Sequence, residues 1–359
     1  MRTAAFRNLA DAAVITEVKN IFLVGENGQG KTNFLEALYF CAYGSSFRKV
    51  HDSEIAERTH KDFSAEITIT DGNSVLIKVE SGKKTVFIDG KKVPDRKELL
   101  SVIPCIVFCH EDMEFVAGSP ERQRWFFDQV LSLYDPVYLD DLRRYRRVLK
   151  SRNAVLRDYS LRRQSGDSGV MLDALDQQCA LYGIKLMEKR ETAAALFSAI
   201  FASLYEEVSG IAGVNVRYLP SWKSYNEAEA IDTLRKRRPA ETAAGLSLSG
   251  PHRDRYLFTR DGEDFAGTAS TGQRRLLALL LRVAQARRFS EMTGRNPILL
   301  LDDVLLEMDG EKRRRFIAAL PDYDQAFYTF LPEEPFQHYR NSGTLVYYVR
   351  DGRIEAEGQ

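Results

Sequence analysis

Cysteine and long apolar runs are scarce in this sequence of 359 residues. It contains four cysteines, and Cys105 and Cys109 alternate along an apolar run that is typical of a buried strand. No second Cys/His pair stands at zinc spacing, so we interpret these thiols as structural. The longest apolar runs, such as 276–281, are too short to span a bilayer, and the N-terminus lacks a signal-peptide core. These absences predict a cytoplasmic protein with no membrane segment.

A net charge of either sign is also missing. Lys plus Arg and Asp plus Glu both total 51, so the formal net charge is zero. Nothing in the overall charge attracts nucleic acid, and any such partner must be met by a local patch. The apolar content of 44% and the charged content of 28% are ordinary for a globular protein with a substantial core.

A phosphate-binding loop pattern is present, and it reads Gly25-Glu26-Asn27-Gly28-Gln29-Gly30-Lys31-Thr32. An apolar run precedes it and a helix-like segment follows it. The glycines allow backbone N–H groups to turn inward around phosphates, and the next helix directs its positive N-terminal end at them. In this pattern Lys31 reaches the β- and γ-phosphates and Thr32 is a ligand of Mg²⁺. The loop predicts that the chain binds a nucleoside triphosphate with Mg²⁺.

A second nucleotide motif is indicated by the apolar strand 298–301, which ends at Asp302 and Asp303. We expect Asp302 to hold the metal, directly or through water, and Asp303 to be the general base or the group that positions the attacking water. Many strands end at acidic loops, so this signal is weak alone. Together with the phosphate loop it becomes strong.

The segment Ser270-Thr271-Gly272-Gln273 stands at the start of an amphipathic helix, just before the acidic strand. One interpretation is an ordinary serine cap that opens a core helix. The other is a resemblance to the signature motif of the ATP-binding-cassette (ABC) superfamily, in which serine, glycine and the helix N-terminus contact the γ-phosphate bound to the opposite subunit. In that case Ser270, Gly272 and Gln273 complete the ATP site of a second copy, and dimerisation follows nucleotide state.

The order of predicted elements indicates an α/β fold with an insertion. Strands at 63–70, 75–79 and 85–88, with a turn at Asp89-Gly90, predict an antiparallel sheet. A strand at 103–109 follows. The C-terminal third alternates helices and strands, which predicts a parallel, helix-covered sheet; its elements are a helix at 272–289, a strand at 298–301, a helix at 310–320, and strands at 326–329 and 345–349.

Between these parts, two stripes of apolar residues at heptad spacing predict an antiparallel helical hairpin with a turn at 165–169. Each arm has about 20 residues of clear pattern, or about 30 Å. A charged helix is then expected to stop at Pro239. We therefore divide the chain into an N-terminal head part at 1–128, a helical arm at 129–245 and a C-terminal head part at 246–359. The first stripe is Leu142, Tyr145, Leu149, Leu156 and Tyr159, with Arg152 in the one missed position; the second is Leu172, Leu175, Cys179, Tyr182 and Leu186.

Five segments in order give a family resemblance over nearly the whole chain: 25–33, 115–120 continued to 126–128, 145–153, 250–254 and 302–304. The sequence resembles the RecF family of bacterial DNA replication and repair proteins. The resemblance implies an ABC/SMC-type (Rad50-like) ATPase head with an inserted, coiled-coil-like arm, and it adds Arg7 to the nucleotide site. It also implies a slowly hydrolysing DNA-binding clamp that forms a homodimer around ATP. Such a clamp acts with RecR and RecO at single-strand gaps, helps RecA displace single-strand-binding protein, and contributes to the SOS response.

A few positions depart from the family pattern. Gln123 replaces the first of two consecutive arginines, Arg255 stands where a second acid is common, and the loop 306–309 differs from the usual Ser-Glu-Leu-Asp. Thr329 takes the place of the superfamily's switch histidine, as it does in RecF-like proteins. The first strand, before Phe6, is expected to be short.

A local basic patch is the candidate DNA interface. Nine basic residues and one acid lie between positions 143 and 163, and we select five of them as DNA contacts: Arg143, Arg146, Arg147, Lys150 and Arg152. Phosphate contacts of this type are independent of sequence and sensitive to salt. The alternative is a solvated helix face that pairs with acids on the partner helix.

Two functions of other classes remain open alongside the clamp. A nucleotide-gated scaffold would bind ATP with hydrolysis incidental, and a transporter ATPase would need a membrane partner and leaves the arm unexplained. A fused nuclease is disfavoured, because no room remains after the last head strand.

Overall fold

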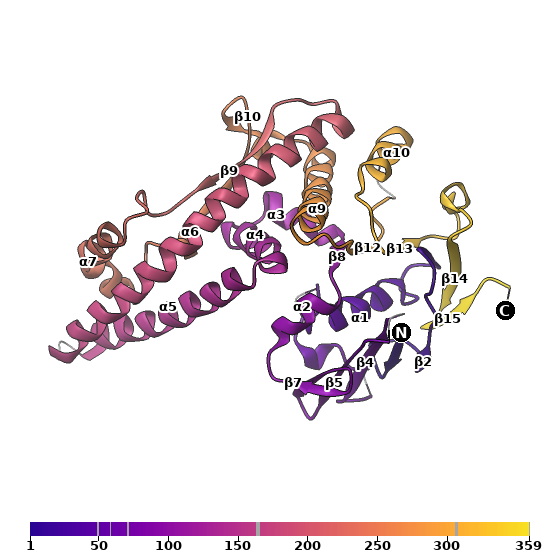
Figure 1. Cartoon of the computed structure of the whole chain (residues 1–359), viewed down its shortest axis with the longest axis horizontal. Coiled ribbons are helices and arrows are strands. Elements are labelled where there is room, and N and C mark those ends of the chain that lie inside the picture. Colours follow the sequence, from indigo (N-terminus) through magenta and orange to yellow (C-terminus); the bar gives the residue numbers. More distant parts are fainter. Residues whose placement is uncertain (49, 58, 70–71, 163–165, 306–307, 359) are drawn as a thin grey trace. The chain divides into compact units, whose positions relative to one another are not determined.

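The computed structural model describes residues 1–48, 50–57, 59–69, 72–162, 166–305 and 308–358. The chain divides into two compact units, one made of residues 1–112 and 286–359 and the other of residues 113–285. The helix α9 (Thr271–Thr293) supplies residues to both units. The elements are labelled in Figure 1.

The first unit is built on a six-stranded sheet with the order β15-β14-β3-β13-β12-β8. All neighbours in it pair in parallel except the edge pair β14 and β15. Every residue of β3 and β8 is buried, as expected for parallel strands covered on both faces. The parallel sheet predicted for the C-terminal third is confirmed, and β3 and β8 join it. Its strands are β3 (Asn20–Val24), β8 (Cys105–Phe108), β12 (Ile298–Leu301), β13 (Gln325–Phe330), β14 (Thr344–Arg350) and β15 (Arg353–Ala356).

A second sheet of the same unit is antiparallel, with the order β2-β1-β4-β5-β6-β7. Both residues of the turn Asp89-Gly90 have positive φ, which is the geometry of a type I′ hairpin. This confirms the predicted antiparallel sheet and its turn. The short first strand, β1, pairs with β4. The strands are β1 (Arg2–Ala4), β2 (Ala12–Ala13), β4 (Phe63–Thr68), β5 (Ser74–Glu80), β6 (Lys83–Ile88) and β7 (Lys91–Val93).

Helix α1 (Lys31–Tyr43) lies in the core of the first unit. Most of its residues are buried, and it ends at Gly44, whose φ of 64° gives the left-handed cap that glycine favours. Helix α10 (Gly310–Ala319) begins at an aspartate cap, because the side chain of Asp309 accepts a hydrogen bond from the backbone of Lys312 at 2.9 Å. A short helix, α2 (Leu99–Val102), precedes β8.

The second unit contains the predicted helical hairpin. Helices α5 (Pro136–Arg162) and α6 (Gly166–Ser209) lie side by side (Figure 1). Asp135 pairs with Lys189 and Arg152 with Asp176, so the partner number falls as the chain advances and the helices are antiparallel. Helix α6 begins inside the predicted turn, which makes 166–169 its first residues; Ser165 lies outside the described residues.

Helix α6 is longer than the heptad stripe predicted. Its 44 residues correspond to about 66 Å. Its second half packs on other elements, since Phe197 contacts Phe126 of α4 (Pro120–Tyr134) and Phe201 contacts Phe258 of β10 (Arg255–Arg260). These partners break the heptad pattern while the helix continues.

The stop predicted at Pro239 is wrong. Helix α7 (Glu227–Ala244) passes through this proline. Packing holds both sides of it in place: Arg238 pairs with Asp176 on α6 at 2.6 Å, and Glu241 is fully buried beside Arg152 at 2.7 Å. Tertiary contacts therefore override the local preference of proline.

A three-stranded antiparallel sheet, with the order β11-β10-β9, completes the second unit. The segment 250–254 is held against it by a buried arginine: Arg190 of α6 contacts Asp254 at 2.7 Å and Asp128 of α4 at 2.7 Å. This segment of the family resemblance is thus a structural junction. The remaining elements are β9 (Val214–Leu219), β10 (Arg255–Arg260), β11 (Glu263–Asp264), α3 (Glu114–Ala117) and α8 (Phe265–Thr268).

Candidate nucleotide site and nucleic-acid interface

The phosphate loop connects the end of β3 to the start of α1, as the pattern predicts. A Cβ at Gly25 would lie 2.4 Å from the carbonyl oxygen of Val349 on the neighbouring strand β14. Gly28 and Gly30 have φ of 79° and 120°, in the region that glycine favours. The backbone therefore requires glycine at positions 25 and 30 and favours it at position 28.

Lys31 is buried against its own loop. Its ammonium group donates to the carbonyl oxygens of Gly25 at 2.6 Å and Glu26 at 3.1 Å. Among the described residues, no side chain caps the N-terminus of α1, so its first N–H groups are open to an anion. The loop therefore has the donors that a chain of phosphates needs.

Two elements support the loop from outside. The C-terminal hairpin turn contacts it, because the backbone N–H groups of Asp351 and Gly352 donate to the side chain and backbone oxygens of Gln29 at 2.6 and 2.9 Å. Next to this turn, Asn8 donates to the carbonyl oxygen of Gly28 at 3.2 Å. Sequence reasoning did not find these supports, although the Asp351-Gly352 dipeptide is a recognisable hairpin signal.

Arg7 lies next to Asn8, and buried Glu36 of α1 holds its guanidinium group at 2.8 Å. The same carboxylate contacts Arg48 at 3.3 Å, and the side chain of Arg7 also donates to the carbonyl oxygen of Glu54 at 2.6 Å. Arg7 is therefore fixed near the phosphate loop, and its contact with nucleotide stays a prediction.

The acidic pair at the end of β12 meets the phosphate loop. Thr32 donates to Asp302 at 2.9 Å, although 270 positions separate them. Thr329 on β13 donates to Asp303 at 2.8 Å and accepts a hydrogen bond from the Asp303 backbone at 2.7 Å. The structure thus brings together the predicted metal and base positions, and it adds Thr329.

The electrostatics of this pair suit a cation. Burial, and then the neighbouring charge of Asp303, raise the pKa of Asp302 to about 7. A divalent ion at this place would favour the ionised carboxylates, and hard oxygen donors such as Thr32 and Asp302 are the ligands that Mg²⁺ prefers. The residues present therefore fit both ATP and Mg²⁺.

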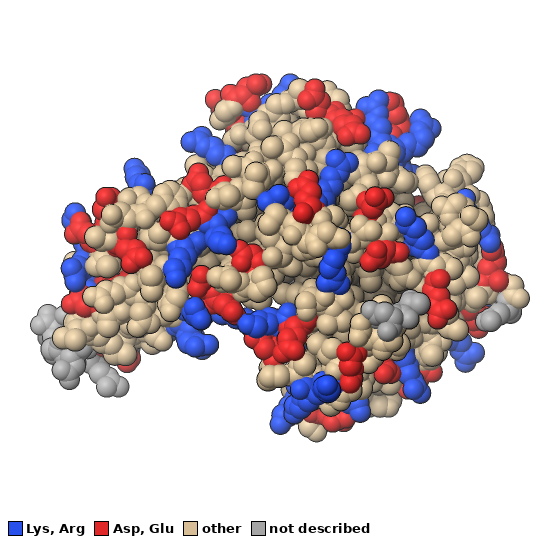
Figure 2. Space-filling view, viewed as in Figure 1, with Lys and Arg blue, Asp and Glu red and all other residues tan. Residues whose placement is uncertain are grey.

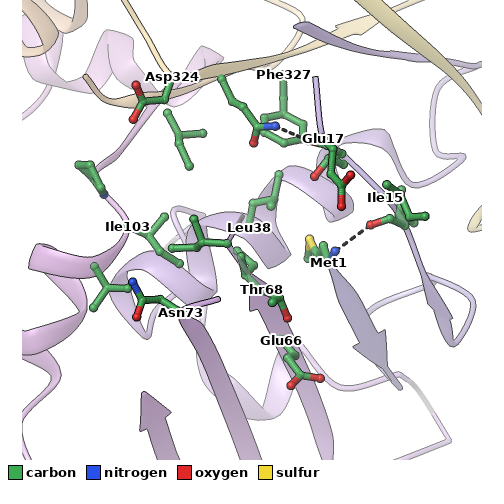
Figure 3. Close-up of a pocket in the computed structure, with 18 of the residues that line it drawn as sticks. Met1, Ile15, Glu17, Leu38, Glu66, Thr68, Asn73, Ile103, Asp324 and Phe327 are labelled. Atoms are coloured by element: carbon green, nitrogen blue, oxygen red, sulfur yellow. Dashed lines mark hydrogen bonds between the residues drawn. The ribbon is translucent and has the colours of Figure 1, made fainter. Parts of the chain in front are cut away.

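A pocket of about 1300 Å³ lies elsewhere in the first unit (Figure 3). Its lining includes Lys19, Ile298 and Gln325, which precede or begin the parallel strands, whereas the phosphate loop follows the end of β3. The side chains of Leu38, Ile103 and Met1 converge on it (Figure 3). Of the described residues, none from 25–32 lines this pocket. The hollow is therefore distinct from the predicted nucleotide site.

The segment 270–273 forms the N-terminus of α9. Ser270 accepts a hydrogen bond from the backbone of Gln273 at 3.3 Å, and the Gln273 side chain accepts one from the backbone of Ser270 at 2.8 Å. This reciprocal capping box confirms the interpretation as a helix cap. Ser270 and Gly272 are exposed, so the cap leaves them accessible; their contact with the ATP of a second copy stays a prediction.

The basic patch on α5 separates into paired and exposed groups. Arg146 contacts Asp128 at 3.0 Å, and Arg144 contacts Asp141 at 3.5 Å. Arg147 and Lys150 are exposed, and Arg143 is half-buried. Figure 2 shows Lys and Arg mixed with Asp and Glu on the face it presents. Part of the patch is thus a solvated, acid-paired face, as the alternative predicted, and the exposed part remains a candidate DNA contact.

Arg152 must be removed from the predicted DNA contacts. Its side chain is 0% exposed and pairs with Asp176 at 2.6 Å and with Glu241 at 2.7 Å, both equally buried. A phosphate cannot reach it without disrupting the arm. Its position in the apolar stripe was the signal that it points into the core.

Comparison with known proteins agrees with this geometry. Residues 1–354 match the family described as RecF/RecN/SMC N terminal domain. The DNA replication and repair protein RecF of Treponema pallidum is 43% identical over 98% of this chain and 99% of its own. The chain belongs to the RecF family. RecF of Staphylococcus aureus is 30% identical over 97% of each chain.

Solved structures place the fold in the same family. The structure described as the recombination mediator protein RecF-ATP in the RecFOR pathway has a TM-score of 0.89 and 25% identity over 99% of this chain and 96% of that chain. An SMC head domain from Pyrococcus furiosus matches with a TM-score of 0.53 and 13% identity, covering 99% of this chain and 94% of that chain, and shares the fold alone. The ABC/SMC-type head predicted from the sequence is confirmed, and this family implies ATPase activity. Within the described residues, every helix is too short or too polar to span a bilayer.

Proposed function

We propose that the chain is an ATP-dependent DNA-binding clamp of recombinational repair and replication restart. It binds gapped DNA without sequence preference, forms a homodimer on ATP and hydrolyses ATP slowly. The observation that carries this proposal is the pair of hydrogen bonds from Thr32 to Asp302 and from Thr329 to Asp303. They lie beside a phosphate loop with open N–H groups, in a chain of the RecF family. RecR is the proposed direct partner, with RecO and RecA loading downstream and SOS induction as a consequence, in the cytoplasm where the chromosome lies.

In the proposed site, Gly25 to Thr32 bind the phosphates and Thr32 with Asp302 hold Mg²⁺, which offsets the charge of the phosphates when bound. Lys31 leaves the carbonyl oxygens of Gly25 and Glu26 and donates to phosphate instead. Asp303 orients the attacking water and accepts its proton. Ser270, Gly272 and Gln273 of a second copy complete the site, which makes dimerisation depend on ATP.

Replacing the proposed base tests whether the function requires ATP hydrolysis or only ATP binding, as in a scaffold. Asp303→Asn keeps the size and one hydrogen-bond acceptor but cannot take a proton at neutral pH. We expect ATP hydrolysis to fall about 10²-fold or more, with ATP binding and ATP-dependent dimers retained. Single-turnover phosphate release and sedimentation with ATP measure these quantities.

The cellular phenotype of the same variant completes this test. Loss of repair in cells that carry Asp303→Asn supports required turnover. A variant that fails to hydrolyse ATP and still restores repair would favour the scaffold. Hydrolysis at the rate of the unmodified protein would reject Asp303 as the base.

The DNA interface is tested by charge reversal at the exposed positions. The double variant Arg147→Glu/Lys150→Glu is expected to weaken duplex binding and to reduce the slope of log K against log salt by about 2, because each lost phosphate contact removes about one released counterion. Arg146 is left intact, since Asp128 contacts it and its reversal would disturb a buried carboxylate. Fluorescence anisotropy over a salt series gives the slope.

A matched control lies on another helix of the same unit. Lys236 of α7 is exposed and pairs with Asp232 one turn away, so Lys236→Glu changes the net charge without touching α5. An unaltered slope of log K against log salt in the α5 variant would show that DNA binds elsewhere on the protein. An equal loss per reversed charge in the control would show that only overall charge matters.

A further inference from the structure

Each aspartate of the acidic pair, Asp302 and Asp303, accepts a hydrogen bond from a different threonine hydroxyl. Thr32 donates to Asp302, whereas the Thr329 hydroxyl oxygen lies 2.8 Å from the nearer carboxylate oxygen of Asp303 and 3.3 Å from that of Asp302. A hydroxyl has one proton to donate, so the shorter contact to Asp303 takes it. The same oxygen accepts the backbone N–H of Asp303 at 2.7 Å. Thr329 therefore holds both the backbone and the carboxylate of one residue.

The backbone of Asp303 needs such support. Its φ is 52°, in the left-handed region that residues other than glycine rarely occupy. A conformation of this kind persists where its surroundings determine it from several sides. Here the hydroxyl of Thr329 supplies one contact at the backbone N–H of Asp303 and another at its carboxylate.

Thr329 is itself fixed by the centre of the sheet. It is buried in β13, between β12 and β3, and lies opposite Leu23 in the parallel register with β3. Its branched side chain is stiff at χ1, so the strand determines where the hydroxyl lies. Asp303 is thus held by a residue of β13, and β13 pairs with β3, the strand that leads into the phosphate loop.

We propose that Thr329 is a positioning residue for ATP hydrolysis: it fixes the orientation of Asp303 relative to the phosphate loop, through a hydrogen bond at the Asp303 backbone and another at its carboxylate. This inference rests on the proposed function of Asp303 as the base. It assigns to Thr329 no contact with ATP.

The test compares Thr329→Val with Thr329→Ser. Valine keeps the branched shape and removes the hydroxyl, whereas serine keeps the hydroxyl and removes the methyl group. We expect valine to lower kcat about 10- to 100-fold with the Kd for ATP nearly unchanged, and serine to restore most of kcat. Thermal unfolding without ATP verifies that both variants fold.

A second readout needs no nucleotide. In ¹⁵N-aspartate-labelled protein, the Asp303 amide, identified by its loss in Asp303→Asn, should exchange slowly with deuterium in the unmodified and serine proteins and fast in the valine protein. A protected amide together with normal kcat in the valine variant would overturn the inference. Loss of ATP affinity in a folded valine variant would do the same, because it would indicate a general structural role. Normal hydrolysis by Asp303→Asn would instead overturn the proposed function, while the amide exchange still reports on Thr329.

Discussion

Lys31→Ala is expected to lose ATP-dependent dimerisation and ATP-dependent DNA binding. In the structure the ammonium group donates to Gly25 and Glu26, so the lysine stabilises the loop and is positioned to move onto the phosphates. Charge-assisted hydrogen bonds contribute about 1.5–3 kcal/mol each, so losing the contacts with two phosphate groups weakens ATP binding about 100-fold or more. Sedimentation with and without ATP and gapped DNA reports in one experiment on dimerisation, on DNA binding and on the dependence of both on ATP.

The control for this variant is Lys19→Ala in the same unit. Lys19 is exposed just before β3, and its ammonium group lies 4.9 Å from the centre of the Tyr323 ring. It carries the same charge at the far end of the strand that leads into the loop, so its loss should leave ATP binding unchanged. ATP should also raise the unfolding temperature of the control and not of Lys31→Ala, because only a bound ligand stabilises the folded state. Unchanged ATP-stimulated dimers in Lys31→Ala would reject the proposed site.

The nucleotide site could be predicted because its chemistry depends on short, contiguous patterns. The phosphate loop is specified by glycines at backbone positions that require or strongly favour glycine, and the acidic pair by its place after an apolar strand. Parallel strands bring such patterns to the same edge of a sheet, so Thr32 and Asp302 meet despite their separation. Thr329 could be named from the family pattern, but its contact with Asp303 required the register of β13 beside β12.

The second unit was less predictable because its contacts are long-range. The helix α7 continues through Pro239 on account of ion pairs to α5 and α6, which no local rule contains. The strand β10 was missed, although the Asp261-Gly262 turn that follows it has positive φ at both residues and is a recognisable hairpin signal. Arg152 was predicted to contact DNA because of its charge, while its place in an apolar stripe correctly indicated that it is buried.

Arg152→Met is expected to destabilise the second unit by about 3–5 kcal/mol, because it leaves buried carboxylates without their partner. Asp176 keeps Arg238 at 2.6 Å. Among the described residues, the Glu241 carboxylate has no second ion pair and keeps a hydrogen bond from the backbone N–H of Leu248 at 2.8 Å. Most of the cost should therefore come from Glu241. Calorimetric unfolding of the full chain measures the change.

A double variant separates the unpaired charge from lost packing. Replacing a buried ion pair by apolar groups is often neutral, so Arg152→Met/Glu241→Met should recover most of the lost stability. Lys150→Met, on the same helix but exposed, is the matched control and should leave unfolding unchanged while weakening DNA binding. If Arg152→Met were instead stable and bound DNA as weakly as the charge-reversed α5, the buried position of this arginine would be contradicted and its original assignment to the DNA interface restored.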